Sequence, residues 1–133
     1  MRIAFRDGYK YQLAETYQVQ TGITVALGTG NQWVDLDESG LLTIQAGYAW
    51  DGATSAPDWD CALRPSCVHD AIYQLIGCGL IGVEHRETAD ALFAQMCRED
   101  GMTGWMVAIW YRAVRRFGPK GGSVAKPVKW APC

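Results

Sequence analysis

Residues able to hydrolyse an ester with water stand in order in the middle of the chain. An Asp-Gly pair, Asp51-Gly52, comes first, followed by His69-Asp70 and then by Asp90. Metal-assisted hydrolysis requires a histidine that takes a proton from water, a carboxylate that orients the histidine, and a second carboxylate beside an oxygen-rich loop. The order of these residues therefore predicts a calcium-dependent hydrolase site.

Helical spacing separates the roles of the histidine and its neighbour. His69 and Tyr73 share a helix face, whereas Asp70 is rotated from His69 by roughly 100°. His69 would then face the reacting water, with Asp90 on the next helix accepting a hydrogen bond from its far ring nitrogen and Tyr73 donating to Asp90. Asp70 would face a cation, and calcium takes about six to eight oxygen ligands. We expect the catalytic residues to be His69, Asp90 and Tyr73, and the calcium ligands to be Asp70 and oxygens of the loop that holds Asp51 and Gly52, including backbone carbonyls.

Three segments resemble the core of the prokaryotic secreted phospholipase A2 family: residues 51–58, 65–73 and 86–96. In that family an Asp-Gly-Cys-Ser loop binds calcium, a Cys-x-x-His-Asp-x-x-Tyr helix carries the base, and an aspartate on the antiparallel helix orients the histidine. The resemblance implies the same roles for the residues above, with phospholipid or another envelope ester as substrate. Ala53 stands where the family has its loop cysteine, so Cys67 lacks the partner that would tie the loop to the helix.

A broader resemblance runs from Tyr9 almost to Gly118. The segments 47–54, 69–73, 86–93 and 113–118 are similar to the motifs of a family of small phage and prophage proteins known as a domain of unknown function. This resemblance implies a phage origin without implying an activity. A phage protein of this kind would be found in the host cytoplasm during phage production, or associated with the virion through tail proteins.

Hydrophobic periodicity indicates the elements that position these residues. The first fifty residues alternate and are interrupted by glycine, which predicts short antiparallel strands joined by turns at 28–31 and 37–40. The predicted strands are 9–13, 17–20, 23–27, 33–36 and 41–44. Residues 51–62, with Pro57 and three aspartates, predict an irregular loop that would bind the metal.

From Pro65 the periodicity changes to that of helices. We expect helices from about Pro65 to Ile76, from near Glu84 to before Gly101, and from about Thr103 to Phe117. The apolar stripe of the second comprises Ala89, Leu92, Phe93, Met96 and Cys97. That of the third comprises Trp105, Met106, Ile109, Trp110, Ala113, Val114 and Phe117, with Arg112, Arg115 and Arg116 elsewhere.

Together these elements predict a single α+β domain over residues 1–133. A small N-terminal antiparallel β-sheet within residues 1–50 would be followed by the metal loop at 51–62 and by three helices within 63–118. The first two helices would form an antiparallel pair like that of phospholipase A2, and residues 119–133 would form a basic tail.

Composition limits the class of protein. Hydrophobic residues make up 49% and charged residues 20% of the chain, which is typical of a soluble globular domain and does not support extensive disorder. Residues 101–133 hold six of the twelve basic residues and none of the fourteen acidic ones. This basic end could contact anionic lipid headgroups or neutralise the acidic body, but it matches no nucleic-acid-binding module, so nucleic acid is not an expected partner. No segment has the pattern of a signal peptide or a membrane span. The five cysteines indicate no disulfide framework, and a reduced compartment is the simplest account, but one or two bridges stay open.

Three alternatives stay open. His69, Asp70, His85 and Asp90 could form a two-histidine metal site. The His-Asp-Tyr-Asp cluster could instead be a buried hydrogen-bond network in a non-catalytic virion or tail-assembly protein. The helix at 103–117 could contact a membrane surface peripherally, although its apolar stripe is also typical of a helix packed against a core.

Overall fold

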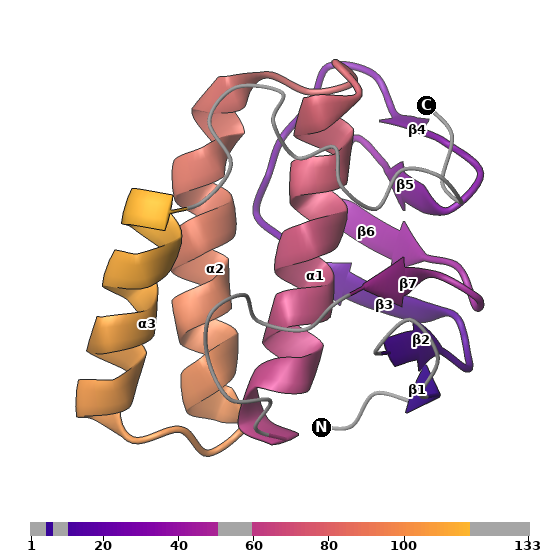
Figure 1. Cartoon of the computed structure of the whole chain (residues 1–133). Coiled ribbons are helices and arrows are strands. Elements are labelled where there is room, and N and C mark those ends of the chain that lie inside the picture. The colour runs from indigo at the N-terminus through magenta and orange to yellow at the C-terminus, as the bar shows by residue number, and fades with distance from the viewer. Residues whose placement is uncertain (1–4, 7–10, 51–59, 118–133) are drawn as a thin grey trace.

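The computed structural model describes residues 5–6, 11–50 and 60–117. Within these ranges the chain has an α+β fold, with strands on one side and three helices on the other (Figure 1). Helix α1, Asp60–Gly77, lies between the strands and α2, Arg86–Glu99, and runs antiparallel to α2. Helix α3, Gly104–Phe117, packs on the far side of α2. The predicted fold class is therefore confirmed.

The strands form two small antiparallel sheets. One has the order β1-β2-β7 and the other the order β3-β6-β5-β4. The bounds are β1 Phe5–Arg6, β2 Tyr11–Leu13, β3 Tyr17–Gln20, β4 Thr29–Gly30, β5 Val34–Leu36, β6 Leu41–Ile44 and β7 Ala49–Trp50. The inward side chains of the second sheet and those of α1 meet in one core, which includes Val34, Leu36, Leu42, Ile44, Ile72 and Leu75. Burying each of these side chains stabilises the fold by about 1.5–3 kcal/mol.

The turn predicted at 37–40 joins β5 to β6 and is confirmed. Asp37 Oδ1 accepts hydrogen bonds from the backbone N–H of Ser39 and Leu41, and the Gly40 N–H donates to the Asp37 carbonyl. The Ser39 hydroxyl also donates to Asp37 and lowers the pKa of this carboxyl. The side chain of Asp37 thus accepts hydrogen bonds from backbone N–H groups that have no partner strand within the tight turn.

One predicted strand is wrong, and one predicted turn lies at a different position. Residues 23–27 do not form a strand, because the Thr21 hydroxyl accepts the Ile23 N–H and itself donates to the Gly40 carbonyl, which turns the backbone out of the sheet. The turn predicted at 28–31 is shifted, since residues 29 and 30 form β4 and Asn31 Oδ1 accepts the N–H groups of residues 33 and 34.

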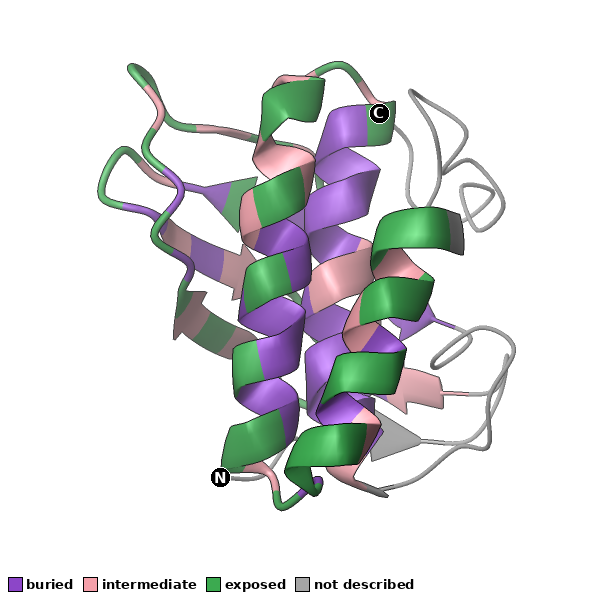
Figure 2. Cartoon of the chain, turned by 90° about the vertical axis from the view of Figure 1, so that its left-hand side faces the viewer, coloured by how far each residue is buried: buried purple, intermediate pink, exposed green. Residues whose placement is uncertain are grey.

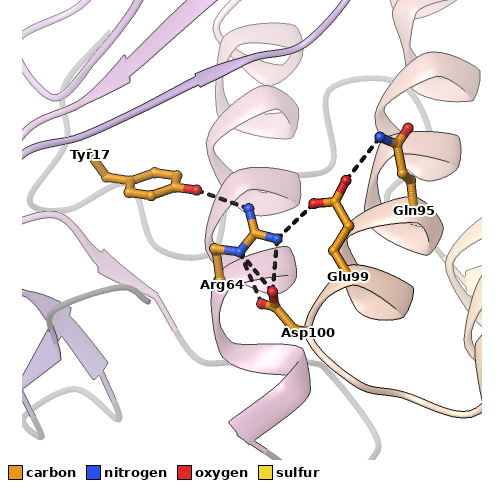
Figure 3. A network of polar contacts seen from close by, with 5 residues as sticks. All are labelled: Tyr17, Arg64, Gln95, Glu99 and Asp100. Atoms are coloured by element: carbon orange, nitrogen blue, oxygen red, sulfur yellow. Dashed lines mark hydrogen bonds and ion pairs between the residues drawn. The ribbon is translucent and has the colours of Figure 1, made fainter. Parts of the chain in front are cut away.

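Helix α1 begins at Asp60, not at Pro65 as predicted, so residues 60–62 of the expected loop are helical. Pro65 lies inside the helix and cannot donate to the Cys61 carbonyl. The turn before the proline is held by Arg64, whose side chain is 2% exposed and bonds to Tyr17 of β3 and to Asp100 at the end of α2 (Figure 3). These tertiary contacts offset the lost backbone bond.

Glycines end the first two helices as expected from the sequence. Gly79 and Gly101 have φ of 75° and 102°, values that side chains disfavour. After α1, the Leu80 N–H donates to the Leu75 carbonyl and the Gly79 N–H to that of Ile76. The same pair of bonds follows α2, from Met102 to Cys97 and from Gly101 to Arg98. Both ends are Schellman motifs, which reverse the chain and let consecutive helices run antiparallel.

The apolar stripe predicted for α2 is buried, whereas that of α3 is only partly so. Val107 and Trp110 are buried, but Trp105 and Ile109 are 67% and 50% exposed. Figure 2 shows that much of the surface of α3 is exposed. Since α3 packs mainly on α2, it buries a narrower stripe than its sequence offers. None of the helices in the described ranges is both long and apolar enough to cross a membrane.

Candidate active site

The predicted catalytic residues lie together between α1 and α2. His69 and Tyr73 are one turn apart on α1, and their ring centroids are 4.3 Å apart. His69 Nε2 lies 2.6 Å from Asp90 Oδ1, and the Tyr73 hydroxyl donates to the same oxygen at 2.7 Å. The hydrogen bonds predicted among these three residues are therefore present, and their catalytic role stays a prediction.

Asp90 is the centre of the cluster. Its side chain is 0% exposed, and Arg115 Nη1 of α3 donates to Oδ2 at 2.7 Å. Burial acts to raise the pKa of Asp90, but the hydrogen bonds from His69, Tyr73 and Arg115 outweigh it and hold this pKa below its ordinary value. Asp90 is therefore an ionised carboxylate at neutral pH and accepts all three bonds.

Tyr73 is held as a hydrogen-bond donor. Burial, together with the hydrogen bond to the Asp90 carboxylate, raises the pKa of Tyr73 to about 12, although Arg86 acts in the opposite direction. Arg86 Nε lies 3.4 Å from the Tyr73 hydroxyl, and its guanidinium lies 5.8 Å from the centre of the tyrosine ring. The hydroxyl hence stays protonated at neutral pH.

His69 is oriented by its neighbours and still reaches solvent. Its side chain is 13% exposed, and its ring lies 5.3 Å from that of Phe93. Since the carboxylate of Asp90 can only accept, Nε2 carries the hydrogen in the neutral ring. Nδ1 makes no hydrogen bond within the described residues. The arrangement leaves an unprotonated ring nitrogen that can take a proton from water.

Asp70 points to a different neighbour, as the helical spacing predicted. The Tyr48 hydroxyl donates to Asp70 Oδ2, and burial, with the Asp70 charge, raises the pKa of Tyr48 well above its ordinary value. Two residues further on, Trp50 Nε1 donates to Ser66 Oγ of α1 at 3.0 Å. The end of β7, directly before Asp51, is thus anchored to the helix that carries Asp70.

The described residues include only part of the predicted calcium site. Asp51 and Gly52 lie outside them, and the described ranges contain no group of three or more His, Cys, Asp or Glu side chains that could hold a metal. Asp70 alone does not fit calcium, so a calcium site depends on oxygens from residues 51 and 52. Cys67 is a buried free thiol, and burial raises its pKa well above its ordinary value.

The described residues do not support the two-histidine alternative. All four of its residues lie in the described ranges, and they do not form a metal-binding group. His85 Nε2 lies instead 3.8 Å from Glu84 Oε2, next to it in the chain.

Arg115 and Tyr48 are the neighbours of the candidate site that the sequence reasoning missed. Arg115 was expected away from the apolar stripe of its helix. On a helical wheel it is rotated by about 40° from Tyr111, which borders the buried side of α3. The signal available in the sequence was the position of Arg115 at the edge of the apolar stripe, next to a helix that carries the buried Asp90.

Comparison of the chain with protein-family models, with curated proteins and with solved structures found no match. The resemblances to the phospholipase A2 and phage families therefore stay predictions drawn from the motifs.

Proposed function

We propose that the protein is a phage-encoded hydrolase of phospholipase A2 type, acting on phospholipid or another ester of the envelope. The observation that carries this proposal is the 2.6 Å contact between His69 Nε2 and Asp90 Oδ1, with Asp90 fully buried. A histidine held by a buried carboxylate through one nitrogen, with the other nitrogen open, is the arrangement of a general base.

His69 would activate water through Nδ1. As the water oxygen bonds to the ester carbonyl carbon, its proton passes to Nδ1, and Asp90 stabilises the imidazolium through the Nε2–H. When the ester C–O bond breaks, the proton returns from Nδ1 to the leaving alkoxide. Tyr73 keeps Asp90 Oδ1 directed at His69 by donating to the same oxygen.

Asp70 supports a calcium-dependent form of this reaction. Together with Asp51 and the Gly52 carbonyl, it would hold calcium, which when bound supplies charge stabilisation for the oxyanion of an acyl ester. The hydrogen bond from Tyr48 orients the Asp70 carboxylate, and the anchored end of β7 starts the predicted loop beside α1.

The exposed part of α3 supports a lipid substrate. Trp105 and Ile109 face outward, and Arg116 follows them in the last turn of the helix. Tryptophan and arginine are favoured at the surface of an anionic membrane. The proposed function therefore includes contact of α3 with the membrane surface.

Hydrolysis of phospholipid vesicles tests the function. Wild type and His69→Asn are assayed with calcium and with a chelator, with His85→Asn as the control because His85 lies outside the cluster. We expect His69→Asn to reduce turnover by about 10²-fold or more, since general-base catalysis contributes about 10²–10⁴-fold. The chelator should reduce wild-type turnover and thermal stability. Equal turnover by wild type and His69→Asn would overturn the proposal.

A non-catalytic role in the virion or tail is the second candidate, and Arg115 favours it. Both oxygens of Asp90 have donors, so the cluster is also complete as a structural network. Detection of the chain in purified virions, bound to tail proteins and without turnover of any ester, would establish this role in place of the enzyme.

A further inference from the structure

The cluster at Asp90 depends on a third helix. His69 and Tyr73 of α1 occupy Oδ1, whereas Oδ2 accepts from Arg115 of α3, and no other described residue donates to Oδ2. Because Asp90 is fully buried, solvent does not substitute for this donor. One of the two carboxylate oxygens of Asp90 thus receives its hydrogen bond from α3.

The packing of α3 on α2 places Arg115. Phe93 of α2 and Trp110 of α3 stack with ring centroids 6.1 Å apart, and Phe93 also contacts His69. Arg115 lies five residues beyond Trp110, and its side chain is 37% exposed, so it reaches Asp90 from the surface. The hydrogen bond to Asp90 raises the pKa of Arg115, which keeps the guanidinium charged.

We propose that Arg115 is a positioning residue for the His69–Asp90 pair. By holding Oδ2 it prevents the carboxylate from turning about its Cβ–Cγ bond, so Oδ1 stays directed at His69 Nε2. The hydrogen on Nε2 then fixes one tautomer, and Nδ1 stays available to water. The consequence for catalysis rests on the proposed function, whereas the effect on the histidine ring does not.

Without Arg115 the carboxylate would have two donors on one oxygen and a buried oxygen with none. A buried acceptor that lacks a donor is unfavourable, so the carboxylate would turn or admit water. Either change weakens the bond to His69. Lysine at this position keeps a cationic donor and should preserve the geometry in part.

The state of the His69 ring tests the inference by NMR of protein labelled with ¹⁵N at histidine. In wild type we expect Nε2 to carry the hydrogen, with its proton shifted downfield by the bond to Asp90. Arg115→Gln should lose the downfield proton and show both neutral tautomers, and Arg115→Lys should keep most of the wild-type signature. Arg112→Gln is the control, because Arg112 is exposed on the same helix and makes no hydrogen bond within the described residues. An unchanged His69 spectrum in folded Arg115→Gln would overturn the proposal.

Two further readouts cover the other outcomes. If Arg115→Gln does not fold, hydrogen exchange of the arginine guanidinium groups is measured in the wild-type protein. We expect slow exchange for Arg115, and exchange as fast as that of Arg112 would contradict the proposal. In the vesicle assay, Arg115→Gln should lower kcat roughly tenfold with KM unchanged, the effect of losing one charge-assisted hydrogen bond. If wild type hydrolyses nothing, the proposed function fails, and the ring tautomer still decides the role of Arg115.

Discussion

Two polar networks lie near opposite ends of α2, and each has a buried charged side chain at its centre. Asp90 is bonded to His69, Tyr73 and Arg115, and Arg64 is bonded to Tyr17, Glu99 and Asp100 (Figure 3). Each network joins a buried ion to opposite charge and to one tyrosine. They differ in one member, since only the Asp90 network contains a histidine that reaches solvent with an open ring nitrogen.

The Arg64 network ties three elements together. Its guanidinium donates to Tyr17 of β3 at 2.9 Å, to Glu99 at 2.9 Å and to Asp100 at 2.8 Å. Burial acts to lower the pKa of Arg64, but these hydrogen bonds outweigh it and raise it. Arg64 does not titrate in the physiological range, so this network holds the fold and offers no proton transfer. A buried charge alone therefore does not make a candidate site, and the group able to transfer a proton is His69.

Removing Arg64 should have the largest effect on stability. Arg64→Ala leaves Asp100, with its side chain 9% exposed, without its counter-charge. We expect the free energy of unfolding to fall by about 3–5 kcal/mol, measured by urea denaturation. Arg98→Ala, on the exposed face of α2, is the control and should change it little. A loss as small as that of the control would show that Arg64 is not a structural tie.

Removing the charge of Asp90 should have the next largest effect. Asp90→Asn keeps the volume of the side chain but weakens its bonds to His69 and Arg115, so we expect stability to fall by about 1.5–3 kcal/mol. It should also abolish the hydrolysis assigned to His69, which Arg64→Ala should leave intact in its folded fraction. Full turnover by Asp90→Asn would show that the Asp90 network, like the Arg64 network, has no part in hydrolysis.

The two tyrosines offer a matched pair with a smaller effect. Tyr73→Phe and Tyr17→Phe each remove one hydroxyl from a buried ion, and each should cost about 1 kcal/mol in unfolding free energy. Only Tyr73→Phe should also lower kcat, because only Tyr73 donates to the carboxylate that orients His69. Equal losses of kcat in both variants would contradict the assignment.

Acid should act on the Asp90 network in a defined direction. Because the pKa of Asp90 is lowered in the folded state, the unfolded chain binds its proton more readily. Its contribution to stability is present above its ordinary pKa of 3.8 and is lost as the pH falls further, through the folded pKa. Urea denaturation of wild type and Asp90→Asn should therefore converge below about pH 4. A difference that stays constant as the pH falls below about 4 would contradict the lowered pKa.

The parts of the fold predicted well from the sequence are those that local spacing determines. The turn at Asp37, the glycines that end α1 and α2, and the buried stripe of α2 follow from residue type and interval along the chain. The bond between His69 and Asp90 was also predicted, because two antiparallel helices joined by a short connection bring these positions level. The strand expected at 23–27 failed because the Thr21 side chain competes with the ladder for backbone groups.

By itself, the sequence determined which side chains share a helix face and where helices end, so it separated His69 and Tyr73 from Asp70. Only the tertiary structure decided that Arg115 completes Asp90, that Tyr48 bonds to Asp70, and that Arg64 holds the turn before Pro65. These contacts join residues far apart in the chain, and they depend on the rotation and separation of packed helices. Residue spacing carries no direct information on either quantity, whereas close packing of side chains sets both.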